Sequence, residues 1–152
     1  MRGTRGRPVR GAADAVTFLG GHGLKTSEPI HVRVIDELPR AARPQAQGCY
    51  LHRERSVYVR TFRAFRRSGN FLHLPADRVL YRSVITHEVG HAIAACNFSV
   101  APPTLQAQEY IAYVTMFATM PEKHRQRVLQ QIPGAGFRCH ANAGSSPAAP
   151  NN

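Results

Sequence analysis

The sequence is poor in cysteine: Cys49, Cys96 and Cys139 are its only three, and no two of them have C-x-x-C spacing. Three thiols cannot all pair within one chain, so the sequence lacks the disulfide framework typical of small secreted domains, although a single bridge can still form. Zinc-finger, helix-turn-helix and ribonucleoprotein strand motifs are absent as well. These absences exclude a disulfide-stabilised scaffold and the common nucleic-acid-binding modules.

Long hydrophobic runs are also missing. No segment of the sequence is long or apolar enough to span a membrane. The apolar stretch nearest the N-terminus, residues 12–19, is short and is interrupted by Asp14, which argues against a signal peptide. We therefore expect a soluble protein without a membrane span, and the sequence does not indicate its compartment.

Acidic residues are scarce, at 9 against 20 Lys and Arg, which gives a net charge of +11. The basic residues gather at residues 2–10, 53–67 and 125–127. Such an Arg-rich surface favours an anionic partner such as nucleic acid, an anionic membrane or an acidic protein, although a solvated surface gives the same composition. A basic, nucleic-acid-associated binding protein is therefore one hypothesis, and it predicts binding that depends on salt and not on metal.

Residues 87–91, which read H-E-V-G-H, are the most informative segment of the chain. On an α-helix, side chains four residues apart lie on one face, so His87 and His91 can both bind one Zn²⁺. Glu88 then lies beside the metal, where it can act as the general base for the water that attacks a carbonyl. The pattern predicts a zinc-dependent peptidase. The alternative is a core helix whose two histidines are satisfied by hydrogen bonds.

The sequence around this motif has the periodicity of one buried helix over residues 78–96. Apolar side chains recur there at helical spacing, no proline interrupts the run, and Asp77 is placed to cap its first turn. Gly90 is an exception, since glycine weakens a helix interior by about 1 kcal/mol. We therefore expect the backbone of another element to approach the helix closely at Gly90.

A catalytic zinc site needs a third protein ligand and an open fourth position. The metzincin pattern, H-E-x-x-H-x-x-G-x-x-H, does not supply that ligand, because Ala94 and Asn97 stand at its last Gly and His positions. Glu109 is the favoured ligand instead, because it is the only acid between Glu88 and Glu122. It begins an apolar stretch, residues 109–118, that predicts a second buried helix with Thr104 as its cap.

Other assignments of the third ligand remain open. Glu109 can instead be an exposed glutamate near the start of its helix, where the helix dipole favours an acid. In that case His124 or His140 would complete the site. A zinc-bound domain without hydrolytic activity is a further hypothesis, and it would retain the metal ligands while tolerating loss of Glu88.

Residues 87–94 and 108–113 resemble the gluzincin group of zinc metallopeptidases, in particular its small bacterial single-domain forms. The resemblance implies a minimal zincin-like fold, in which a short sheet packs on the active-site helix and a second helix carries the glutamate ligand. It also implies a zinc cofactor and a peptide or protein substrate. Gluzincins often carry an acid four residues after the ligand glutamate to orient a histidine, and Tyr113 stands there in this chain. Tyr113 is either a partner of a ligand or of a developing oxyanion, or a core tyrosine.

The rest of the sequence predicts one α+β domain over residues 12–138, between a disordered basic N-terminus, residues 1–11, and a disordered tail, residues 139–152. The further elements expected are a helix at residues 12–19, a strand at 30–35, a hairpin of strands 48–52 and 56–60, a short edge strand at 71–74, and a third helix from Pro121 to Ile132. In zincin-like folds such an edge strand lies over the metal and pairs with the substrate backbone, and the resemblance implies this role for residues 71–74.

Overall fold

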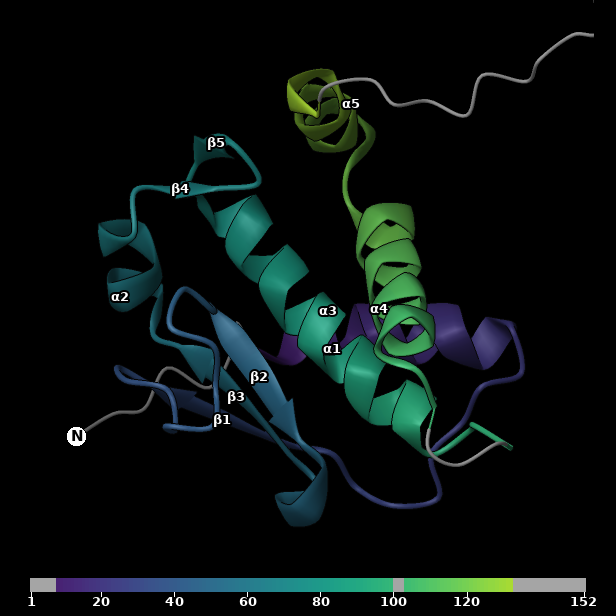
Figure 1. Ribbon diagram of the computed structural model, residues 1–152. Helices are drawn as coiled ribbons and strands as arrows, with labels where there is room; N and C mark the ends of the chain where they lie inside the picture. The colour runs from purple at the N-terminus through teal and green to yellow at the C-terminus, as the bar shows by residue number, and fades with distance from the viewer. Residues whose placement is uncertain (1–7, 100–102, 133–152) are drawn as a thin grey trace, which may run out of the picture.

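The computed structural model describes residues 8–99 and 103–132, and within these ranges the chain combines α-helices with small β-sheets (Figure 1). The α+β class expected from the sequence is confirmed. In chain order the elements are α1 (Pro8–Gly21), β1 (His31–Ile35), β2 (Gly48–Leu51), η1 (His52–Glu54), β3 (Ser56–Arg60), α2 (Phe62–Arg67), β4 (Asn70–Phe71), β5 (Leu74–Pro75), α3 (Arg78–Ala95), α4 (Leu105–Thr119) and α5 (Glu122–Gln131).

The larger sheet has the strand order β1-β3-β2. β2 and β3 pair antiparallel, with Gly48 opposite Val59 and Leu51 opposite Ser56, so the hairpin expected in this region is confirmed. β1 pairs with β3 in parallel. Within the described residues, β2 is therefore an edge strand, and one row of its backbone N–H and C=O groups has no strand partner.

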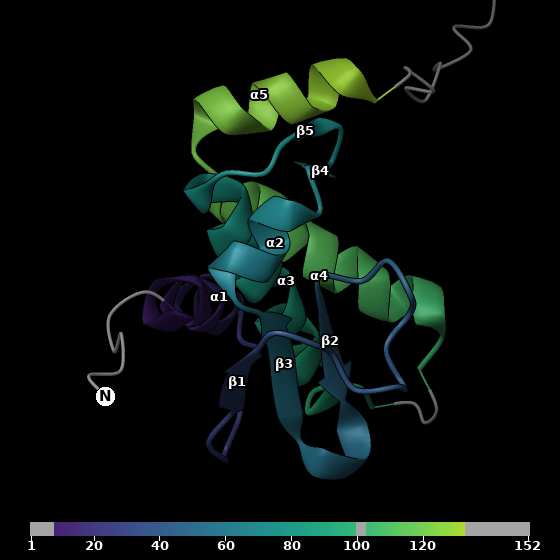
Figure 2. The same cartoon turned by 90° about the vertical axis from the view of Figure 1, so that its left-hand side faces the viewer.

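Helix α3 is the centre of the fold. Figures 1 and 2 show the larger sheet on one side of α3 and α4 on the other, with α1 crossing nearby. Side chains of α3 such as Ile85 join Val57 of β3 and Met116 of α4 in one hydrophobic core, and all three are fully buried. Because α3 is covered on both sides, its position is fixed by the packing of the whole domain.

The N-terminus of α3 is held by Asp77. Its carboxylate accepts a hydrogen bond of 2.8 Å from the Leu80 N–H, which confirms Asp77 as the cap. The same carboxylate lies 2.9 Å from Nε2 of His124 on α5, at the end of the molecule that also carries β4 and β5 (Figure 2). Burial alone would raise the pKa of Asp77, but the hydrogen bonds from Leu80 and His124 lower it below its usual value.

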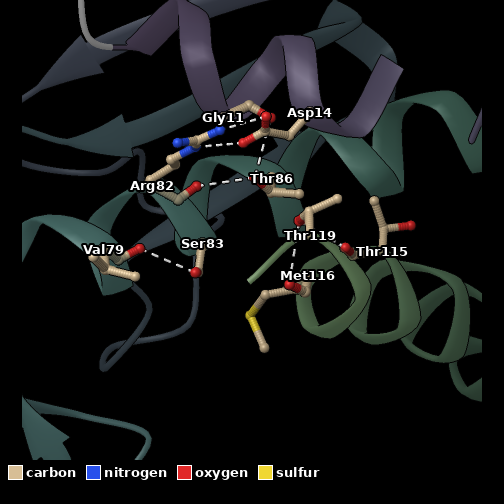
Figure 3. Close-up of polar contacts among 9 residues, drawn as sticks. All are labelled: Gly11, Asp14, Val79, Arg82, Ser83, Thr86, Thr115, Met116 and Thr119. Atoms are coloured by element: carbon tan, nitrogen blue, oxygen red, sulfur yellow. Dashed lines mark hydrogen bonds and ion pairs between the residues drawn. The ribbon is translucent and has the colours of Figure 1, made fainter. Parts of the chain in front are cut away.

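Helix α1 is joined to α3 by a close contact and by polar groups (Figure 3). A Cβ at Gly11 would lie 2.7 Å from the carbonyl oxygen of Arg82, so only glycine lets the helices cross this closely. Arg82 forms an ion pair with Asp14, and the buried Thr86 hydroxyl lies 3.1 Å from the Gly11 carbonyl oxygen as well as from that of Arg82. These contacts hold the α3 backbone next to His87 against α1.

Helix α4 packs on the opposite side of α3 at Gly90. A Cβ at Gly90 would lie 3.3 Å from Cα of Ala112 and 3.6 Å from Cβ of Thr115, both on α4. The expected close approach at Gly90 is confirmed. Thr104 caps α4, as expected, by accepting a hydrogen bond from the Ala107 N–H. The close packing at Gly90 brings α4 near α3, and with it Glu109, which lies about one turn before Ala112.

Some sequence-based expectations differ from the structure. Residues 71–74 were expected to form the edge strand over the metal, and this is wrong: Phe71 and Leu74 pair with each other in the separate β4–β5 hairpin, whose turn holds Leu72 and His73 at positive φ. The edge strand beside α3 is β2. The first helix begins at Pro8 and not at residue 12, so residues 8–11 belong to it. The expectations for residues 1–7 and 133–152 lie outside the described residues.

Candidate metal centre

Three side chains of α3 and α4 meet at one point. His87 and His91 lie one turn apart on the same face of α3, and their Nε2 atoms are 3.1 Å apart. Oε2 of Glu109 on α4 lies 3.5 Å from Nε2 of His87 and 3.7 Å from Nε2 of His91. The structure thus brings together the three residues that the sequence indicated as ligands.

The size of this triangle fits a small divalent cation. Zinc bonds of about 2.0–2.2 Å at tetrahedral angles place the ligand atoms about 3.3–3.6 Å apart, and the three observed separations run from 3.1 to 3.7 Å. Two imidazoles and one carboxylate form a donor set that zinc accepts. With three protein donors, a fourth coordination position is left for water or substrate, as in catalytic sites.

Both histidines are prepared to act as neutral donors. Burial and the nearby His91 lower the pKa of His87 to about 3, and burial lowers the pKa of His91, against the opposing effect of Glu109. A neutral ring can offer Nε2 to a metal in the tautomer that carries its proton on Nδ1. If Nε2 of His87 binds a metal, Nδ1 must carry the proton. This buried Nδ1 has no hydrogen-bond partner within the described part of the chain.

Glu88 lies next to the triangle but does not belong to it. It follows His87 on α3 and is only 9% exposed. Burial and the negative charge of Glu109 raise its pKa to about 8, while a backbone hydrogen bond from Tyr50 opposes the shift. Its Cγ lies 2.6 Å from the point that a Cβ at Gly48 would occupy, so the glycine at the start of β2 makes the space for this carboxylate.

Tyr113 is not a core residue, because it remains 42% exposed. Its ring packs edge-on against the ring of His87, with centroids 4.6 Å apart. Burial and the charges of Glu109 and Glu88 raise its pKa, and Arg43 acts in the opposite direction. The Tyr113 ring is therefore in contact with one of the candidate metal ligands.

The alternative third ligand His124 lies elsewhere. Its Nε2 atom contacts Asp77 at the N-terminus of α3, and it is not part of the group that could hold a metal. His140, the other alternative, lies outside the described residues. Glu109 is also not an exposed first-turn acid, since α4 begins at Leu105 and the Glu109 side chain is 32% exposed.

The three candidate ligands line a cleft of about 680 Å³. Its floor is α3, with Val84, His87, Glu88 and His91. One wall is α4, and the other is formed by residues 41–51 apart from Pro44, which include the whole of β2. The unpaired edge of β2 and the candidate metal centre therefore belong to one cavity. No motif or periodicity in the sequence pointed to residues 41–47, which have no regular secondary structure and all of which except Pro44 line this wall.

A family model covers almost the whole chain, from residue 4 to residue 143. The chain belongs to DUF6639, a family of unknown function. No curated protein and no solved structure matches it. Membership of DUF6639 assigns no chemistry, so function has to be argued from the site. The matched residues contain the H-E-V-G-H segment and Glu109.

The surface charge of this DUF6639 member is partly neutralised. Arg55 and Arg125, which belong to two of the Arg-rich segments, form ion pairs with acidic residues, so these segments are not uniformly free to bind an anion. In the described part of the chain, no helix is long and apolar enough to cross a membrane.

Proposed function

We propose that this protein is a zinc-dependent peptidase in which His87, His91 and Glu109 bind the metal and Glu88 is the general base. The observation that carries the proposal is the convergence of three donor atoms within 4.8 Å of one another, with a buried carboxylate beside them on the same helix. The gluzincin-like order of the motif and the downstream glutamate supports the same assignment. We also propose that the α+β arrangement is a minimal zincin-like fold.

The side chains can be given separate roles. A bound zinc ion supplies a Lewis acid that polarises a carbonyl and lowers the pKa of water. Glu88 accepts the proton of the attacking water and passes it to the leaving amine nitrogen. It must be ionised to do so, and a cation held by its neighbours favours the ionised form against the effect of burial.

The shape of the cleft supports an extended peptide as substrate. An extended chain can add to the edge of β2 that has no strand partner, through backbone groups other than the Tyr50 N–H that bonds Glu88, and its carbonyl would then lie over α3. The 680 Å³ volume is sufficient for several residues of a peptide. The proposed class of substrate is therefore a peptide or an unfolded segment of a protein.

The test is cleavage of a mixed peptide pool, followed by mass spectrometry, with the zinc-loaded protein. We expect cleavage that a chelator abolishes and that zinc restores. Glu88→Gln should retain the metal and lose about 10²–10⁴-fold in rate. Gly20→Ala is a matched control because a Cβ at Gly20 contacts nothing within 4 Å.

The same preparations separate the other hypotheses. Stoichiometric metal without cleavage would contradict the peptidase and favour the zinc-bound domain without hydrolytic activity. Nucleic-acid binding that survives the chelator, in a protein that holds no metal, would favour the basic binding protein.

A further inference from the structure

In the described part of the chain, the cleft is lined by acidic side chains and by one basic side chain. The acidic ones are the carboxylates Glu88 and Glu109, and both belong to the proposed metal centre. Among the described residues that line the cleft, Arg43 is the only Lys or Arg. In a protein with 20 basic residues, a single cation in the cleft is a specific feature of this wall.

The side chain of Arg43 makes no polar interaction with the rest of the described chain. It forms none of the ion pairs and none of the hydrogen bonds found among residues 8–99 and 103–132, and the residue is exposed. By contrast, Arg55, Arg82 and Arg125 each pair with an acid. The guanidinium of Arg43 therefore has its five donors available for a ligand.

The backbone that carries Arg43 is fixed to the sheet. Its carbonyl oxygen accepts a hydrogen bond of 3.0 Å from the Ala46 N–H, which closes a turn through Pro44. The side chain of Arg60, at the end of β3, donates to the carbonyl oxygen of Ala46, and the Arg60 N–H donates to that of Gln47. Arg43 is thus presented on an anchored turn.

Arg43 faces the same space as the metal ligands. Arg43 on one wall and Tyr113 on the opposite wall line the same cleft. Tyr113 in turn packs against His87, with ring centroids 4.6 Å apart. A group bound by Arg43 would therefore lie in the same cleft as a peptide held over α3.

Guanidinium and carboxylate groups match in charge and in planar, bidentate geometry, so among the groups of a peptide a carboxylate is the preferred ligand of a free arginine. We propose that Arg43 binds a carboxylate of the substrate, either its C-terminal carboxylate or an Asp or Glu side chain. Arg43 then selects peptides that carry such a group close to the scissile bond. This inference rests on the peptidase function proposed above and names its substrate class.

The test measures peptide binding to the zinc-loaded, full-length Glu88→Gln protein, so that bound peptides stay intact. The probes are pools of dansylated peptides without internal acids, ending in a free carboxylate or in an amide. Two further amidated pools carry one internal Glu or one internal Gln. We expect the free-acid pool or the Glu pool to bind about ten- to hundredfold more tightly than its neutral counterpart, and the pool that does so identifies the source of the carboxylate.

Adding Arg43→Gln should reduce this ratio to about one. Arg40→Gln is the matched control, because Arg40 is an exposed arginine of the same segment that does not line the cleft, and it should leave the ratio unchanged. Equal binding of charged and neutral pools by the parent protein, or a preference that survives Arg43→Gln, would overturn the proposal. Failure of the peptidase function is seen separately, as absence of Glu88-dependent cleavage of the same pools by the wild-type protein.

Discussion

Gly48→Ala is expected to separate metal binding from hydrolysis. The added methyl would lie 2.6 Å from Cγ of Glu88, 3.1 Å from its Oε1 and 3.1 Å from the carbonyl oxygen of Tyr58. Carbon atoms in contact are about 3.5–4.0 Å apart, so either Glu88 or β2 must move by about 1 Å. No ligand atom of His87, His91 or Glu109 is among the nearest neighbours of this methyl.

The size of the effect follows from this displacement. A misplacement of about 1 Å of a reacting group costs about 10²-fold in rate. The loss in folding free energy should be about 1–3 kcal/mol, as for overpacking elsewhere. We therefore expect a large fall in kcat with a folded protein and an unchanged metal content.

The assay compares wild type, Gly48→Ala and the control Gly20→Ala for zinc content, urea unfolding and rate of peptide cleavage. Gly20 lies in α1, where alanine should be neutral or stabilising by about 1 kcal/mol. Cleavage by Gly48→Ala at the wild-type rate would refute the idea that this glycine makes the space for the general base. Loss of zinc in Gly48→Ala would show instead that β2 supports the metal ligands.

Three further predictions concern stability. In metal-free protein, Glu88 has a raised pKa, so the folded state binds more protons than the unfolded state between about pH 4.5 and pH 8, and stability falls as pH rises through this window. Glu88→Gln should therefore gain a few kcal/mol relative to wild type across that range in urea titrations, and a constant difference would contradict the buried position of Glu88. Asp77→Ala should lose about 1–2 kcal/mol of unfolding free energy, whereas Asp77→Asn should retain most of the cap and lose only the charge opposite His124; equal losses would argue against capping. Gly11→Ala, whose methyl would lie 2.7 Å from the Arg82 carbonyl oxygen, should lower the unfolding free energy by about 1–3 kcal/mol without changing the metal content, and an unchanged thermal midpoint would contradict the tight crossing of α1 and α3.

The local signals in the sequence were sufficient for the central part of the site. The H-E-V-G-H segment lies on one continuous helix because apolar periodicity and the Asp77 cap both favour it. The close approach at Gly90 was predictable because glycine destabilises a helix interior, and close packing against another backbone offsets that cost. Glu109 could be selected because so few acids follow the motif, and the structure places it 3.5 Å from His87.

The parts that the sequence did not reveal depend on long-range packing. Which strand forms the edge beside α3 is decided by the parallel pairing of β1 with β3, and no local pattern encodes that pairing. Gly48 looks like an ordinary hairpin glycine until Glu88 is placed beside it. Arg43 is one of many arginines in the sequence, and only the fold puts it in the cleft.

The most direct test of the central claim is the metal content of purified protein, measured by elemental analysis of wild type, His87→Ala, Glu109→Ala and Gly20→Ala. Metal ligation by His87 and Glu109 predicts about one zinc per chain in wild type and Gly20→Ala, and loss of metal in the other two variants although they remain folded. A folded wild-type protein that takes up no metal even when zinc is added, or a Glu109→Ala variant that keeps the full wild-type affinity, would contradict it.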